Sequence, residues 1–201
     1  MPPDKELNPT LLNNCIVQPI LYWFASVSLF AAGWKAKGKM PDIKKFVLVA
    51  APHSSNWDFV FFLLIIFNYR ISVHWMGKDT MFKWPFNGLL KRLGGIPIDR
   101  SGKGNVVQSM VKAFEKSKQL IITIAPSGTR GKVTEWKTGF YHIADQAKVP
   151  IVLGFIDYKK KTIGIGPVFT PSGNIDADMT SIKAFYVQFS DKYPKRPFAG
   201  E

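Results

Sequence analysis

The sequence predicts a single α/β domain with a mostly parallel central sheet flanked by helices. Short, continuously apolar runs, which are typical of strands covered on both faces, alternate with longer segments of helical character. Two strand-like runs near the C-terminus are separated only by lysines 159–161, which indicates a hairpin. Strands that alternate with helices need crossover connections, and such connections favour parallel pairing.

The expected elements can be placed along the chain from the spacing of apolar residues, glycine and proline. After an apolar N-terminal helix, we expect strands at 46–51, 71–76, 96–100, 120–125, 151–158 and 162–169. A turn is expected at 77–79. Helices are expected at 59–67, 80–92, 105–118, 138–148 and 176–193, with Pro85 near a kink or break in the second of them. The helix at 59–67 is apolar all round, so we expect it in the core; the alternative is that part of it lines an apolar groove.

The composition describes a folded, strongly basic chain. Of 201 residues, 46% are hydrophobic, and 27 lysines and arginines against 14 acidic residues give a net charge of +13. A positive field favours anionic partners such as nucleic acid, an anionic membrane face or phosphorylated small molecules. The basic residues are spread rather than clustered with stacking aromatic residues, so we expect no nucleic-acid partner. Cys15 is the only cysteine, which excludes an internal disulfide and a cysteine-based metal cluster.

Residues 16–34 form the most apolar segment, carry no charge and are followed by Lys35, Lys37 and Lys39. The segment approaches the ~20 residues of a membrane-spanning helix, although Pro19 and Gln18 weaken that interpretation. Three placements are open: a helix lying in the membrane interface, a helix packed on the domain itself, and a true span.

His53 precedes Asp58 by five positions, in the loop between an expected strand and the helix that follows it. A carboxylate in the first helical turn can accept a hydrogen bond from one imidazole nitrogen and leave the other free as a base. The alternative is structural, because residues 55–58 also fit a capping box in which Asp58 merely begins the helix.

Two further loops each carry an arginine after an expected strand. Arg100 follows the run 95–99, and Arg130 follows Ser127, Gly128 and Thr129. Two guanidinium groups at the carboxyl ends of parallel strands can clamp a phosphate, and Lys78 can add positive charge. The alternative for each arginine is a structural ion pair.

In order, the chain carries residues 53–58 (HSSNWD), 95–100 (GIPIDR), 126–130 (PSGTR) and 149–152 (VPIV). This series resembles the four motifs of the glycerolipid acyltransferase family, whose best-known members are the lysophosphatidic acid acyltransferases. The resemblance covers roughly residues 47–152.

The resemblance implies that His53 is the general base that takes a proton from the acceptor hydroxyl, and that Asp58 orients it. It implies that Arg100 and Arg130 hold the acceptor's phosphate, with Gly128 allowing close backbone approach, and that Thr129 and Ser127 lie in the same substrate-binding loop. One departure is Ser127, which stands where the family usually has glutamate, and this leaves the acceptor headgroup open.

The resemblance further implies an enzyme that moves a fatty acyl group from acyl-CoA or acyl-ACP (acyl carrier protein) to the hydroxyl of a lysophospholipid. No metal or other cofactor is implied beyond this acyl-donor co-substrate. We expect a membrane-associating helical segment at 1–40 and an acyltransferase domain at 41–201, bound to the cytoplasmic face of a membrane. The alternative function is a non-catalytic basic peripheral protein that binds anionic lipid.

Overall fold

A computed structural model describes residue 7 and residues 9–52, 57–98, 106–127 and 136–189. Within these residues a seven-stranded sheet has the order β1-β7-β6-β2-β5-β3-β4. Its strands are β1 (Lys35–Lys37), β2 (Lys45–Ala51), β3 (His74–Lys78), β4 (Gly95–Ile98), β5 (Leu120–Ile124), β6 (Ile151–Asp157) and β7 (Thr162–Phe169). The helices are η1 (Leu11–Asn13), α1 (Val17–Ala31), α2 (Trp57–Asn68), η2 (Asp79–Met81), α3 (Asn87–Arg92), α4 (Val106–Lys116), α5 (Gly139–Gln146) and α6 (Ile175–Val187).

The sheet is mostly parallel, as expected for strands joined by helical crossovers. Strands β6, β2, β5, β3 and β4 all run in one direction, whereas β7 pairs antiparallel with β6. The predicted hairpin with residues 159–161 at its tip is therefore confirmed. The carboxyl ends of β2, β4 and β5 lie at the same edge of the sheet, and this edge is where open parallel sheets bind ligands.

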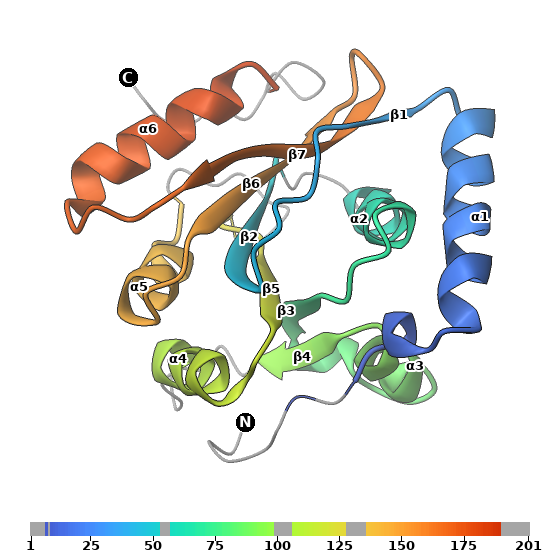
Figure 1. Cartoon of the computed structure of the whole chain (residues 1–201), viewed down its shortest axis with the longest axis horizontal. Coiled ribbons are helices and arrows are strands. Elements are labelled where there is room, and N and C mark those ends of the chain that lie inside the picture. The colour runs from blue at the N-terminus through green and yellow to red at the C-terminus, as the bar shows by residue number, and fades with distance from the viewer. Residues whose placement is uncertain (1–6, 8, 53–56, 99–105, 128–135, 190–201) are drawn as a thin grey trace.

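Two apolar cores lie on opposite faces of the sheet, because successive strand residues point to opposite sides. On one face, α4, α5 and α6 cover a core that contains Met110, Phe140 and Tyr186. On the other face, α2 packs on the strands through Ile65, Ile66 and Phe67. Figure 1 shows α2 lying between α1 and the sheet, which explains why the helix is apolar on all sides.

Helix α1 packs on α2 by its inner side, where Ala25 and Leu29 are buried and Ser26 accepts a hydrogen bond from the Asn68 amide. Pro19 lies in the first turn of α1, where its missing N–H costs no helical hydrogen bond. No helix in the described segments combines the length and the apolar character that crossing a membrane requires.

The structure corrects three local predictions. Strand β3 begins at His74 and ends at Lys78, later than the expected 71–76, because its pairing with β5 and β4 starts at that point; Lys78 is therefore a strand residue and not part of a turn. The expected helix at 80–92 is divided into η2 and α3, on either side of Pro85, whose nitrogen cannot donate a hydrogen bond. Lys35–Lys37, which were expected only as a basic flank, form β1 and pair with β7.

Candidate functional site

A cavity of about 830 Å³ lies at the carboxyl ends of the parallel strands. Ala51 and Pro52, at the end of β2, line it together with Ile98 at the end of β4 and Pro126 after β5. These three strand ends lead directly into the loops that carry His53, Arg100 and Arg130 in the sequence. His53, Arg100, Gly128, Thr129 and Arg130 themselves lie outside the described residues, so their predicted roles stay predictions.

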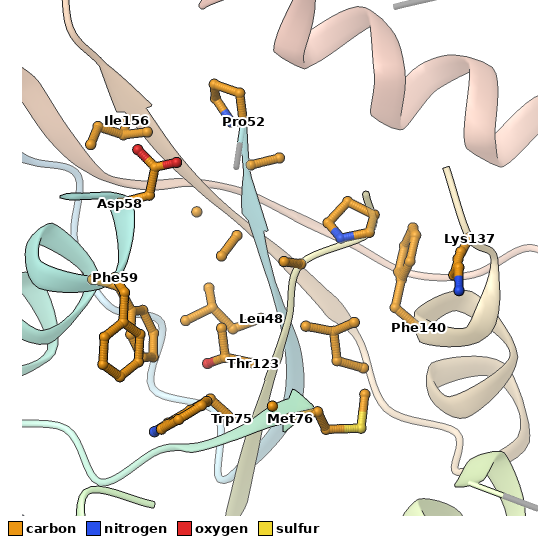
Figure 2. Close-up of a pocket in the computed structure, with 18 of the residues that line it drawn as sticks. Leu48, Pro52, Asp58, Phe59, Trp75, Met76, Thr123, Lys137, Phe140 and Ile156 are labelled. Atoms are coloured by element: carbon orange, nitrogen blue, oxygen red, sulfur yellow. The ribbon is translucent and has the colours of Figure 1, made fainter. Parts of the chain in front are cut away.

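Of the predicted catalytic pair, only Asp58 lies within the residues that the structure describes. It lies in the first turn of α2, lines the cavity and is only 7% exposed. Its negative charge at this position is favoured by the positive end of the helix dipole. Figure 2 shows the carboxylate on one side of the cavity, near Pro52 and Ile156, with Lys137 and Phe140 on the far side.

The carboxylate of Asp58 is held from a distant part of the chain. Tyr158, the residue after β6, donates a hydrogen bond from its phenol to Asp58 Oδ1. The Tyr158 ring packs edge-on against Trp34, at a centroid separation of 5.3 Å, and against Phe61 of α2, at 5.9 Å. These contacts fix the phenol, and the phenol in turn restricts the rotation of the Asp58 side chain. A buried carboxylate with a fixed orientation can hold a neighbouring imidazole in one tautomer.

The interior of the cavity is largely apolar and has walls on both faces of the sheet. On the α2 face, Phe59, Phe62 and Ile65 approach Leu48 and Trp75, as Figure 2 shows for the labelled residues. Three residues of the helix that was expected to be core therefore line the cavity. On the opposite face the cavity is lined by residues of the α4–α5 layer and of β3, namely Met76, Val106, Val107, Phe140 and Ile143.

One polar atom interrupts this apolar lining. Thr123, at the centre of β5, is 5% exposed, and its Oγ1 has no hydrogen-bond partner among the described residues. Thr123 is paired across the sheet with Leu48 and with Trp75, so it lies between two apolar neighbours. A buried hydroxyl without a hydrogen-bond partner lowers the stability of the folded state.

Two of the predicted substrate-binding residues, Lys78 and Ser127, lie within the described residues. Lys78 ends β3, is exposed and lines the cavity. Ser127 follows the cavity-lining Pro126, and its Oγ is buried with no hydrogen-bond partner in the described part of the chain. The described residues contain no group of three or more His, Cys, Asp and Glu side chains that could hold a metal ion.

Two cavity-related residues were missed by the sequence analysis. Lys137 is exposed and lines the cavity, and its backbone N–H donates a hydrogen bond to the Pro126 carbonyl. Tyr158 was predicted only as the end of a strand. Neither residue belongs to a motif, and the contact between Tyr158 and Asp58 joins positions that are 100 residues apart, so local spacing carries no signal for it.

Comparison with known proteins gives a consistent result. Residues 35–153, more than half of the chain, match the model of the acyltransferase family. The 1-acyl-sn-glycerol-3-phosphate acyltransferase of Limnanthes alba is 30% identical over 136 residues, which are 62% of this chain and 47% of the plant protein. The enzyme of the same name from Saccharomyces cerevisiae is 31% identical over 126 residues, 59% of this chain and 41% of the yeast protein. The chain thus spans less than half the length of these two relatives.

The fold agrees with that of a solved structure. The crystal structure of the 1-acyl-sn-glycerophosphate (LPA) acyltransferase PlsC from Thermotoga maritima superposes with a TM-score of 0.63. The alignment covers 90% of this chain and 80% of the other, at 16% sequence identity, so it bears on the fold alone. The family match over residues 35–153, which includes the site at the strand ends, shows that the chain belongs to the acyltransferase family.

Proposed function

We propose that this chain is an O-acyltransferase that transfers a fatty acyl group from acyl-CoA or acyl-ACP to the free hydroxyl of a lysophospholipid such as 1-acyl-glycerol-3-phosphate. The observation that carries the proposal is the position of Asp58. It is buried in the first turn of α2, at a cavity that an acyl chain can fill, and the His53 loop enters this helix. Membership of the acyltransferase family and the names of the two relatives support the same reaction.

The proposed chemistry starts with the neutral imidazole of His53, oriented by Asp58, which takes the proton of the acceptor hydroxyl. The acceptor oxygen attacks the thioester carbonyl carbon, and the carbonyl oxygen becomes negatively charged. The C–S bond then breaks, and the leaving thiolate takes the proton from the imidazolium. A hydroxyl with a pKa far above neutral needs such a base, and histidine suits this role near pH 7.

The developing oxyanion needs hydrogen-bond donors that are already in place. Backbone N–H groups at the start of α2 are suitable, because they lie at the positive end of the helix dipole. The loop at Gly128 is the other candidate from the sequence. The phosphate of the acceptor is assigned to Arg100 and Arg130, with Thr129 and Ser127 in the same loop and Lys78 adding charge at the cavity.

The apolar cavity is assigned to an acyl chain. Ligand pockets in proteins typically enclose several hundred Å³ and are mostly apolar with a few polar groups, and the cavity of about 830 Å³ fits this description. The few polar groups that line it include the carboxylate of Asp58 and the ammonium groups of Lys78 and Lys137.

A membrane surface is the proposed location, with α1 as the attachment. The outer side of α1 exposes six large apolar residues, in a stripe that no other described element covers: Ile16, Ile20, Trp23, Phe24, Val27 and Phe30. Their exposed fractions range from 61% to 86%. A helix with such a side, followed by lysines, is suited to lie in the headgroup region of the cytoplasmic face.

Acyl transfer by the purified chain in lipid vesicles tests the proposal. The assay offers acyl-CoA and acyl-ACP as donors and a panel of lysophospholipids with different headgroups as acceptors, and mass spectrometry identifies the product. We expect a diacyl phospholipid from the wild type, and loss of its formation in His53→Ala. His142→Ala, on the exposed side of α5, is the matched control and should retain full activity. Product formation that survives His53→Ala would refute the proposed mechanism.

A further inference from the structure

A second group of exposed apolar side chains lies on the segment that joins β3 to β4. We call it the η2–α3 patch; it consists of Met81, Trp84, Phe86 and Leu89. Trp84 is 92% exposed, Phe86 62%, Leu89 52% and Met81 38%. Isolated exposed apolar residues are ordinary, but four of them within nine positions, two being large aromatic residues, indicate a contact surface.

The surroundings of the patch are basic. Between residues 78 and 92 the sequence holds four basic residues, all of them exposed, and one acidic residue: Lys78, Lys83, Lys91, Arg92 and Asp79. The Asp79 carboxylate accepts a hydrogen bond from the Thr80 N–H at 2.7 Å, so part of its capacity is used within η2. Aromatic residues interleaved with lysine and arginine complement the headgroup region of an anionic bilayer, where ring and cation both find partners.

The patch lies on the same side of the sheet as the apolar stripe of α1. Phe82, between the patch residues, stacks on Trp75 with 5.6 Å between ring centroids, and Trp75 in turn contacts Phe59 of α2 at 4.7 Å. Leu93, at the end of α3, also packs against the core under α1 and α2. Figure 1 places α1 and α3 at the same side of the molecule. The two apolar regions therefore belong to segments that pack on the same face of the sheet.

The patch also adjoins the cavity. β3 ends at Lys78, at the edge of the sheet where the cavity lies, and η2 follows it directly. Lys78 and Met81 are lining residues of the cavity as well as members of this segment. Whatever covers the patch therefore lies beside exposed residues that line the cavity.

We propose that the η2–α3 patch is a second membrane-contact site that docks on the surface of an anionic phospholipid bilayer, with Trp84 and Phe86 inserted at headgroup depth. The inference rests on the proposed attachment of α1 for the first contact. Two contacts on one side of the sheet fix the orientation of the domain, which a single helix cannot do. They bring the cavity opening to the lipid surface, so that a lysophospholipid can enter from the bilayer without crossing water.

Vesicle binding by the purified full-length chain tests this inference independently of acyl transfer. We would measure partitioning into phosphatidylcholine vesicles with and without 30% phosphatidylglycerol, by flotation. We expect Trp84→Ala with Phe86→Ala to weaken partitioning at least tenfold. Lys83→Glu with Lys91→Glu should remove most of the preference for the anionic vesicles, since each lysine near such a surface contributes roughly fivefold to binding.

Matched controls lie on other elements. Lys112→Glu with Lys118→Glu makes the same change in net charge at exposed positions in and just after α4, on the other face of the sheet, and should change partitioning less than twofold. Val168→Ala with Val187→Ala truncates exposed apolar residues of β7 and α6 and should likewise have little effect. Because all these side chains are exposed, the thermal unfolding of every variant should match that of the wild type.

The outcomes separate this inference from the proposed function. Wild-type partitioning by the patch variants, with loss of binding in Trp23→Ala with Phe24→Ala of α1, would overturn the second contact and leave the α1 attachment intact. A patch variant that alters the size-exclusion elution volume but not vesicle binding would identify a second copy of the chain as the partner and would also overturn it. Acyl transfer to a detergent-dispersed acceptor would remain as a separate test of the chemistry.

Discussion

The phenol of Tyr158 donates a hydrogen bond to the Asp58 carboxylate, across 100 positions of sequence. Asp58 lies in the first turn of α2, and Tyr158 begins the turn between β6 and β7, so the bond ties the start of the helix to the last pair of strands. The ring of Tyr158 also packs against Trp34, which follows α1 in the sequence. The orientation of the carboxylate is therefore set by the tertiary fold and not by its own helix alone.

Tyr158→Phe should lower kcat for acyl transfer roughly tenfold and leave KM nearly unchanged. The hydroxyl that fixes Asp58 is lost, and hydrogen bonds to charged groups are worth about 1.5–3 kcal/mol. The packing of the ring on Trp34 and Phe61 is preserved. Steady-state kinetics in vesicles would measure both constants.

Tyr69→Phe is the control for this substitution, because Tyr69 donates to the Lys37 carbonyl, at 2.7 Å, at the other end of α2. It should leave kcat unchanged. In an Asp58→Asn background, Tyr158→Phe should have little further effect if the phenol acts through the carboxylate. An equal loss in both backgrounds would mean that Tyr158 acts in some other way.

The depth of the cavity should set the preferred acyl chain. Ile65 lies seven residues after Asp58, about 10 Å further along α2, and lines the inner part of the cavity. Ile65→Phe should shift the preference toward donors shorter by about two to four carbons, and Ile65→Ala toward longer ones. Competition between donors of different lengths, with products separated by mass, would measure the shift.

Ile66→Ala serves as the control for Ile65→Ala, because Ile66 is also buried in α2 but does not line the cavity. Both alanine variants should lose stability, by about 2–4 kcal/mol. Only the variant at position 65 should change the chain-length profile. The same shift at position 66 would show that loosening of the core is responsible.

Thr123→Val should stabilise the fold by about 1 kcal/mol and raise Tm by about 2–4 °C. The substitution replaces a buried hydroxyl that has no partner in the described part of the chain with a methyl group of similar size. Thr10→Val gives the opposite sign, a loss of about 1–2 kcal/mol. Thr10 is equally buried, but its Oγ1 lies 2.8 Å from the Ser72 hydroxyl and accepts from the Leu12 N–H. Thermal unfolding of the two variants would contradict this interpretation if both moved Tm in the same direction.

The pH dependence of folding should contain a contribution from Asp178. Its carboxylate accepts hydrogen bonds from the Ser172 N–H, at 2.7 Å, and from the hydroxyls of Ser172 and Tyr141, both at 2.8 Å. Burial by itself would raise the pKa of Asp178, but the hydrogen bonds from Ser172 and Tyr141 lower it below its ordinary value. The folded state therefore binds fewer protons than the unfolded state, and the stabilisation is present above the unfolded pKa and lost as pH falls through the folded one.

We expect Asp178→Asn to lower the free energy of unfolding at pH 7 by about 1–3 kcal/mol. The difference from the wild type should begin to shrink below about pH 4, where the carboxylate of the unfolded chain takes up a proton, and should keep shrinking until the folded carboxylate is protonated at lower pH. Denaturant unfolding at several pH values measures both effects. Asp176→Asn, at an exposed position two residues earlier in α6, is the control and should change little. A difference that stays constant down to pH 2.5 would exclude this carboxylate as the source.

The sequence predicted the central part of the fold well, for a physical reason. Buried parallel strands such as β2 and β5 are mostly continuous runs of apolar residues. The two strands of the β6–β7 hairpin are separated by a short polar turn. The edge strand β1 was missed because Lys35–Lys37 are exposed and carry no apolar pattern; they are a strand only because they pair with β7. The start of β3 was predicted too early because apolar residues precede the strand. Where the strand begins is set by its pairing with β5.

The candidate site was predicted as far as local motifs reach. Asp58 was singled out by its spacing from His53, and the structure places it at the cavity, while its role stays a prediction. Tyr158, which contacts Asp58, and the exposed Lys137, which lines the cavity, belong to no motif and reach these positions only through the fold. The roles given to Arg100 and Arg130 rest on the sequence, because both residues lie outside the described part of the chain.

A double-mutant cycle on kcat with His53→Ala and Asp58→Asn tests the proposed general base most directly. If Asp58 acts by orienting His53, Asp58→Asn alone should lower kcat at least a hundredfold, and His53→Ala should lower it at least as much. The double variant should be no slower than His53→Ala. A further loss in the double variant equal to the loss from Asp58→Asn alone would contradict the pairing of the two residues.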